Sequence, residues 1–218
     1  MVKGAVETVQ SVEATPQLSL VGTMVSADGS QEKRSICKQI VSDKVILWNL
    51  CCMVIIWMSA SFNNYLIGYQ LKYIQGDIFE NQLAAQFSEI VAYILSGTLL
   101  FWLDFKKVLI FAFIIGLSGM LALIITQTTE QIWLIVIIFA AKIGISSSFN
   151  TVFIANNKLF PVSIIATTFG ICNTFCRTAT IFTPYVAELD PKTISEWSFC
   201  AVCVVAIVAS ISLRTKSN

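Results

Sequence analysis

The stretch IWLIVIIFAAKIGISSSFNTVFI, residues 132–154, decides the fold of this chain. It is long enough to cross the hydrocarbon core of a bilayer, which takes roughly 20 apolar residues in a helix. Lys142 nevertheless interrupts it near the middle. A charge at the centre of a membrane helix costs about 2.5–3.5 kcal/mol even on the lenient insertion scale. The stretch therefore predicts a membrane helix with a polar surface that other helices share.

Five further segments have the same length and apolar character. Of the 218 residues, 56% are hydrophobic and 12% are charged, against about 25% charged residues in a soluble domain. The runs are continuous rather than alternating, which favours helices over a barrel. We predict an all-α, multi-pass membrane bundle over residues 45–213, with a flexible cytoplasmic leader (1–44) and a cytoplasmic tail (214–218). The six predicted helices are about 45–69, 82–103, 107–126, 132–154, 162–186 and 196–213.

Composition argues against several function classes. Histidine is absent, and with it the most common general base and metal ligand. Cys200 and Cys203 form a C-x-x-C without a second ligand pair, so we interpret them as small apolar residues. We expect no enzyme, no metal and no cofactor. A net charge of +1 without a basic run also predicts no nucleic-acid binding.

Positive charge predicts the orientation, because cytoplasmic loops of membrane proteins are rich in Lys and Arg. Six helices put both termini on one side, and the opposite side receives only Lys72 and Lys192. We expect both termini in the cytoplasm, and the plasma membrane rather than an organelle membrane. The basic residues on the side of the termini are Lys3, Lys33, Arg34, Lys38, Lys44, Lys106, Lys107, Lys158, Arg214 and Lys216.

Three charged residues fall in the interior of the predicted helices, away from their ends: Glu89, Lys142 and Arg177. At about 1.5 Å per residue, all three lie roughly 10–15 Å below the outer boundary, near one level. Each belongs to a polar stripe at helical spacing. They either pair across helices to fix the packing or line a pathway, and the residues leave both interpretations open. The stripes continue through Gln82, Gln86, Tyr93 and Ser96, through Ser146, Phe149, Asn150 and Phe153, and through Gly170, Asn173, Thr180 and Pro184.

Helices 107–126 and 196–213 lack such a stripe. This suits helices that face lipid, so the other four helices would surround a polar region. The helix over residues 45–69 contributes Asn63, Asn64 and Tyr65 near its outer end.

Several short motifs occur in an order known from one group of carriers. The sequence GDIF at residues 76–79, followed by Glu89, resembles the region of their seventh and eighth helices. Residues 141–150, AKIGISSSFN, resemble their tenth helix, and LFP at 159–161 resembles their E-L-Y-P-T loop. The seven-residue spacings of their eleventh helix are kept by Gly170, Arg177 and Pro184.

By these motifs, residues 45–213 resemble the C-terminal six-helix half of the organic cation/anion transporter family, within the major facilitator superfamily. The resemblance implies transport of small organic ions by alternating access, in which two six-helix halves rock around a site near the midplane. The position of Arg177 tends to be basic in the family's anion transporters, so it implies a preference for organic anions. By the same resemblance, Tyr65 matches a tyrosine that lines the central cavity.

The expected partners are therefore the lipid bilayer, a small organic ion and a second six-helix half. That half is either a missing N-terminal half or another subunit. The alternative is a non-transporting structural or accessory subunit, whose polar face docks onto another membrane protein. The predicted substrate-binding residues are Arg177, Lys142, Glu89, Tyr65, Phe149, Asn150 and Asn173.

Overall fold

The computed structural model describes residues 40–71, 78–126, 131–189 and 193–214. Two compact units divide the chain, Met1–Lys44 and Val45–Asn218. Nearly all of the predicted leader and most of the predicted tail lie outside the described residues. The helical bundle belongs to the second unit.

Every predicted apolar segment forms a helix, and the prediction of an all-α membrane bundle is confirmed. α5 ends at Leu159, five residues beyond the predicted boundary. It stops there because Phe160 precedes Pro161, and a residue before proline disfavours the helical conformation. The helices are α2 (Lys44–Gln70), α3 (Ile78–Trp102), α4 (Phe105–Thr126), α5 (Gln131–Leu159), α6 (Ile165–Ala187) and α7 (Thr193–Ser212).

Five of these helices, all except α6, are long and apolar enough to cross a membrane among the residues described. α6 has the length, at 23 residues, but Asn173, Arg177 and several threonines dilute its apolar character. In hydrocarbon such a helix needs its polar face covered by protein or water. The fifth predicted span, residues 162–186, is therefore the one whose environment most depends on what lies against it.

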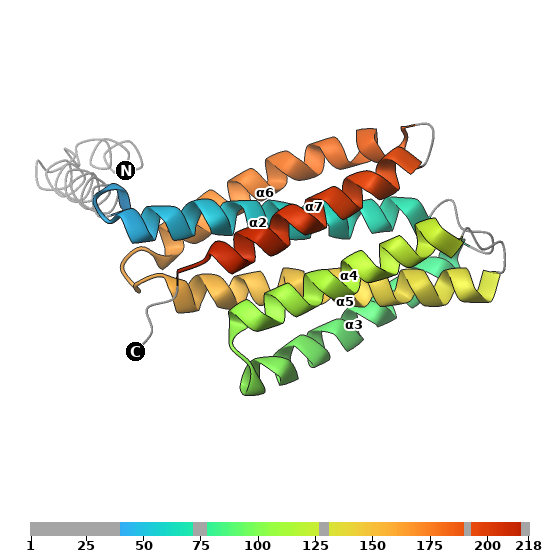
Figure 1. Cartoon of the computed structure of the whole chain (residues 1–218), viewed down its shortest axis with the longest axis horizontal. Helices are drawn as coiled ribbons and strands as arrows, with labels where there is room; N and C mark the ends of the chain where they lie inside the picture. Colours follow the sequence, from blue (N-terminus) through green and yellow to red (C-terminus); the bar gives the residue numbers. More distant parts are fainter. Residues whose placement is uncertain (1–39, 72–77, 127–130, 190–192, 215–218) are drawn as a thin grey trace, which may run out of the picture. The chain divides into compact units, whose positions relative to one another are not determined.

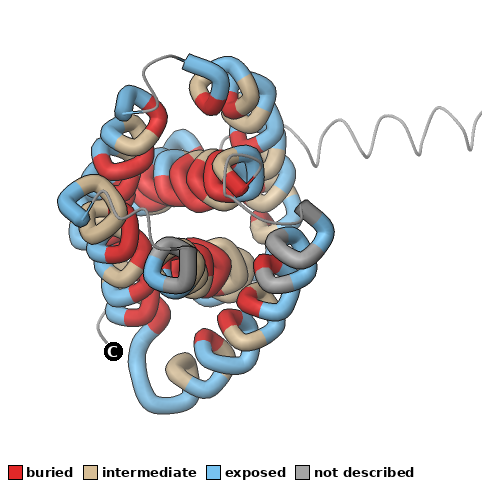
Figure 2. Tube along the Cα trace, turned by 90° about the vertical axis from the view of Figure 1, so that its right-hand side faces the viewer, coloured by how far each residue is buried: buried red, intermediate tan, exposed pale blue. Residues whose placement is uncertain are grey.

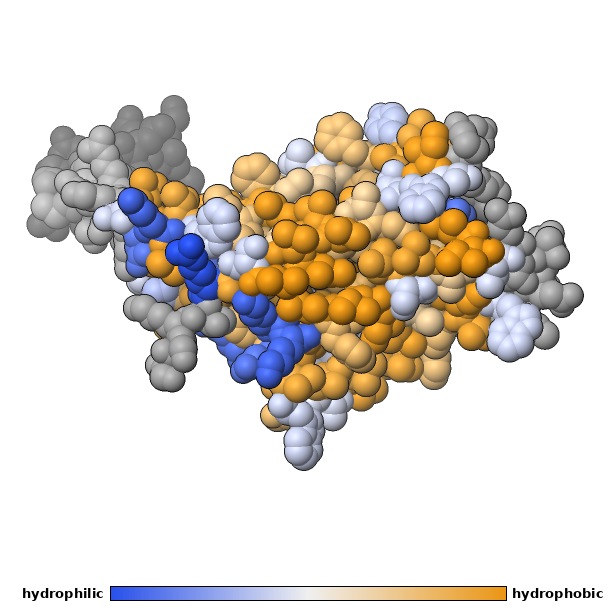
Figure 3. Space-filling model, in the orientation of Figure 1, coloured by the Kyte–Doolittle hydropathy of each residue, from blue (hydrophilic) through white to orange (hydrophobic). Residues whose placement is uncertain are grey.

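α2 and α5 run through the centre of the bundle (Figures 1 and 2). α4 and α7 lie on one side of them, and α3 and α6 flank the other side. The α4–α7 side is almost uniformly apolar in Figure 3, apart from one end. Exposed Phe111, Ile114, Val204 and Val208 lie on these two helices, which agrees with the lipid-facing positions expected for them.

Small residues let α4 and α5 approach closely. A Cβ atom added at Gly144 would lie 2.5 Å from the backbone nitrogen of Gly116 and 2.7 Å from the carbonyl oxygen of Ala112. A Cβ added at Gly119 would lie 2.8 Å from the Cβ of Ala141. Close backbone approach is how membrane helices gain packing energy without a hydrophobic driving force. This contact places α5, and with it Lys142, against the rest of the bundle.

We expect Gly144→Ala to lower the free energy of unfolding by about 1–3 kcal/mol, because the new methyl group meets backbone that cannot move aside cheaply. Gly97→Ala is the matched control, since nothing lies within 4 Å of a Cβ added at Gly97. Equilibrium unfolding of both variants in mixed micelles of mild detergent and dodecyl sulfate measures the difference. Equal stabilities would contradict the close α4–α5 packing.

Candidate functional site: a polar cleft between α2, α3 and α5

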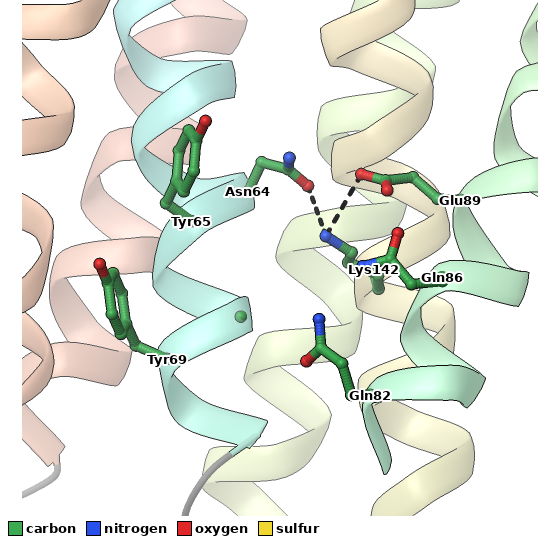
Figure 4. A pocket seen from close by; sticks show the side chains of 8 residues that line it. Asn64, Tyr65, Tyr69, Gln82, Gln86, Glu89 and Lys142 are labelled. Carbon is green, nitrogen blue, oxygen red and sulfur yellow. Dashed lines mark hydrogen bonds and ion pairs between the residues drawn. The ribbon is translucent and has the colours of Figure 1, made fainter. Parts of the chain in front are cut away.

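A polar cleft of about 380 Å³ opens between α2, α3 and α5. Figure 4 shows its side chains converging from the three helices, with Lys142 at the back. The lining residues are Asn64, Tyr65, Gly68 and Tyr69 from α2, Gln82, Gln86 and Glu89 from α3, and Lys142 from α5.

Lys142 is the centre of this cleft. It is 6% exposed, and its Nζ donates a hydrogen bond of 2.7 Å to Asn64 Oδ1. The same Nζ lies 3.5 Å from Glu89 Oε1, and Ser146 Oγ donates to Asn64 Oδ1 at 3.3 Å. One lysine therefore links three helices, and Glu89 and Lys142 do lie at one level, as their positions along the helices predict.

Two further hydrogen bonds join α3 to α5 next to the cleft. Ser147 Oγ donates to the carbonyl oxygen of Ala92 at 3.2 Å, and Asn150 Nδ2 donates to Ser96 Oγ at 2.8 Å. Asn150, a predicted binding residue, thus takes part in the contact between these helices and is not among the residues that line the cleft.

Aromatic rings pack between α2, α5 and α6. Phe153 stacks edge-on against Phe149, with ring centroids 5.3 Å apart, and against Trp57, at 4.9 Å. Trp57 also packs against Phe169 at 5.1 Å. Phe149 follows Lys142 by seven residues along α5, which is about 10 Å at helical rise. This predicted binding residue therefore lies in an aromatic cluster displaced toward the end of α5, and the cluster fills the space between three helices.

Arg177 reaches the cleft from α6 through Tyr65. Its Nη1 donates to Tyr65 Oη at 3.4 Å, and Tyr65 lines the cleft while 41% of it stays exposed. Arg177 itself is exposed and does not line the cleft. Asn173, one turn earlier on α6, is half-buried. The structure thus places a second cation at the edge of the site, next to Tyr65.

Several membrane transporters are similar in sequence to this chain. No family model matches the chain. Organic cation/carnitine transporter 2 of Homo sapiens is 24% identical over 153 residues, which are 68% of this chain and 28% of that protein. A putative transporter of Caenorhabditis elegans is 22% identical over 158 residues, 72% of this chain and 32% of that protein. The chain is similar to organic cation/carnitine transporters.

This relationship confirms the family resemblance read from the sequence motifs. Solute carrier family 22 member 21 of Mus musculus is a further relative, 21% identical over 136 residues, or 62% of this chain and 24% of that protein. The chain spans less than a third of the length of these relatives. The relatives and the apolar helices together make the chain a multi-pass integral membrane protein.

Five lining residues are not among the binding residues predicted from the sequence. Gln82 and Gln86 lie on the predicted stripe of their helix, so periodicity could have found them. Asn64 carries a weaker signal, an amide within an apolar segment. No group of three or more His, Cys, Asp or Glu that could hold a metal ion occurs within the described ranges. The missed lining residues are Asn64, Gly68, Tyr69, Gln82 and Gln86.

Proposed function

We propose that this chain forms one half of a membrane carrier for small organic ions, that it favours organic anions, and that it works by alternating access. The observation that carries the proposal is the charge balance of one layer. Lys142 and Arg177 are two cations, whereas Glu89 is one carboxylate and already lies beside Lys142. Two positive charges and one negative charge leave a net charge of +1 beside the cleft.

Arg177 is the cation with free binding capacity. A guanidinium has five N–H donors, and among the described residues Tyr65 accepts a hydrogen bond from one of its nitrogens, Nη1. Arginine binds planar carboxylates through two parallel hydrogen bonds. The human relative is named for organic cations and carnitine, so the proposed preference for anions rests on Arg177 of this chain and on its exposed position.

A second six-helix half is the partner we propose. Gln82 and Gln86 are exposed on α3, and Thr178 and Arg177 are exposed on α6. Hydrocarbon is a costly environment for such side chains, whereas a facing half with water between would solvate them. Alternating access would then consist of rocking this half against the other around the cleft.

The orientation proposed from the sequence is consistent with where the basic side chains gather. Lys106, Lys107, Lys158 and Arg214 lie at the end of the bundle where α4 begins and where α5 and α7 end. We propose that this end is cytoplasmic, with both termini there, in the plasma membrane. An epitope tag before Met1 should become accessible to antibody only after cells are permeabilised. Accessibility in intact cells would contradict this orientation.

Uptake by cells that express the chain tests the proposed function. We expect saturable uptake of a small aromatic carboxylate above that of control cells, and weaker uptake of a quaternary ammonium ion of similar size. No saturable uptake of either ion, from a chain that reaches the membrane and purifies in a fixed complex with unrelated helices, would favour the accessory-subunit alternative.

A further inference from the structure

The end of α7 is held by side chains from two other helices. The last carbonyl groups of a helix have no partner within it, and here α2 and α4 supply the donors. Asn49 also accepts a hydrogen bond of 2.9 Å from the backbone nitrogen of Arg214. The donated bonds run from Trp48 Nε1 to Ser212 O at 3.0 Å, from Lys106 Nζ to Leu213 O at 2.9 Å, and from Asn49 Nδ2 to Arg214 O at 2.9 Å.

This junction lies at the surface of the membrane. α7 has 20 residues, or about 30 Å at 1.5 Å per residue, which equals the thickness of the hydrocarbon core. Its last residues therefore reach the level of the lipid headgroups. Trp48 is 48% exposed there, in the position that tryptophan prefers at membrane interfaces.

Two basic side chains, those of Lys106 and Arg214, take part in the junction, and a third, Lys107, is the next residue of α4. The Arg214 guanidinium carbon lies 6.0 Å from the centre of the Trp48 ring, within the range of a cation–π contact. Lys106 uses one of its three donors on α7, and Lys107 is exposed beside it. Asp104 is the acid that precedes the two lysines in the chain.

The apolar face of α7 begins directly above these charges. Ile211 and Val208, at 57% and 58%, are among its exposed residues. Figure 3 shows hydrophilic side chains gathered at one end of the α4–α7 side, next to this continuous apolar surface. A ligand that complements both features has an anionic head and long apolar chains.

We propose that Trp48, Lys106, Lys107 and Arg214, here called the basic corner, bind the phosphate headgroup of an anionic phospholipid. The acyl chains lie along the apolar face of α7. Basic groups at the cytoplasmic ends of membrane helices attract anionic lipids by about 1 kcal/mol for each Lys or Arg near the surface. This site lies on the opposite side of the bundle from the polar cleft, and the proposal does not depend on transport.

Native mass spectrometry of the full chain in detergent, titrated with phosphatidylglycerol or phosphatidylcholine, tests the basic corner. We expect tighter binding of phosphatidylglycerol. Lys107→Gln and Arg214→Gln should each weaken it about five-fold, the equivalent of about 1 kcal/mol for each charge. Lys158→Gln is the matched control, since Lys158 is exposed at the same end of the bundle but on α5, and it should change the affinity less than two-fold.

The variants keep the junction itself, because the Lys107 side chain donates no bond to α7 and Arg214 joins it through its backbone. The lipid affinity of Lys107→Gln therefore tests the proposal by itself, even if Arg214→Gln unfolds. Equal affinity for the two lipids, an unchanged affinity in Lys107→Gln, or an equal loss in Lys158→Gln would each overturn the proposal. So would equally tight binding of glycerol phosphate, which carries the headgroup charge without acyl chains.

Discussion

Lys142→Met is expected to lower the free energy of unfolding by about 3–5 kcal/mol, because removing one partner of a buried ion pair leaves the other charge uncompensated. Glu89 would remain four-fifths buried without its cation, and Asn64 Oδ1 would lose its donor at 2.7 Å. Equilibrium unfolding in mixed micelles measures this loss. Lys158→Met, at an exposed position, is the control and should change the stability by less than about 0.5 kcal/mol.

The double variant Lys142→Met, Glu89→Gln separates pairing from function. Removing both charges should restore much of the stability, since replacing a whole buried pair is often nearly neutral. A restored variant that still takes up anions as the wild type does would make the pair a packing element alone. A restored variant without uptake would place both residues in the pathway. A single variant as stable as the wild type would contradict the central place of Lys142.

Arg177→Asp should abolish the preference for anions. The layer would then carry one cation, Lys142, and two carboxylates, for a net charge of −1. Loss of a charge-paired ligand contact is worth about 2–5 kcal/mol, so we expect anion uptake to fall at least about 30-fold and cation uptake to rise. Uptake of a matched carboxylate and ammonium pair measures both changes, with surface expression measured in parallel.

Arg177→Lys is the matched control. It keeps the charge but loses the planar fork that binds a carboxylate through two bonds, so intermediate uptake is expected. Because Arg177 is exposed, neither variant should lose much stability. Unchanged anion uptake by a well-expressed Arg177→Asp variant would contradict the proposed role of this residue.

The sequence predicts the helices well because length and apolar character alone define a membrane span. It also predicts the level shared by Glu89 and Lys142, since the helical rise converts positions into depths. α6 is the exception in composition, because Asn173 and Arg177 make it more polar than the five helices that are apolar enough to cross a membrane. The same polarity makes α6 a candidate to border a water-filled cleft.

The lining of the cleft is harder to predict from the sequence. Periodicity assigns a residue to one face of its helix, but it does not say which residue of another helix that face will contact. Phe149 and Asn150 share the stripe of Lys142, yet one packs in an aromatic cluster and the other bonds to Ser96. Asn64 becomes the partner of Lys142 only through the way α2 crosses α5. Crossing geometry depends on the packing of every helix at once, which no single segment specifies.

Everything proposed for the cleft requires that its open side faces water and not lipid. The most direct test is the reaction of introduced cysteines with a membrane-impermeant, charged thiol reagent, after the seven native cysteines are replaced. Gln86→Cys lies in the cleft, whereas Val204→Cys, on exposed α7 surface, is the lipid-facing control. We predict rapid labelling at position 86, which an organic anion slows, and none at position 204. Equal labelling at both positions, or none at position 86, would contradict a water-filled cleft.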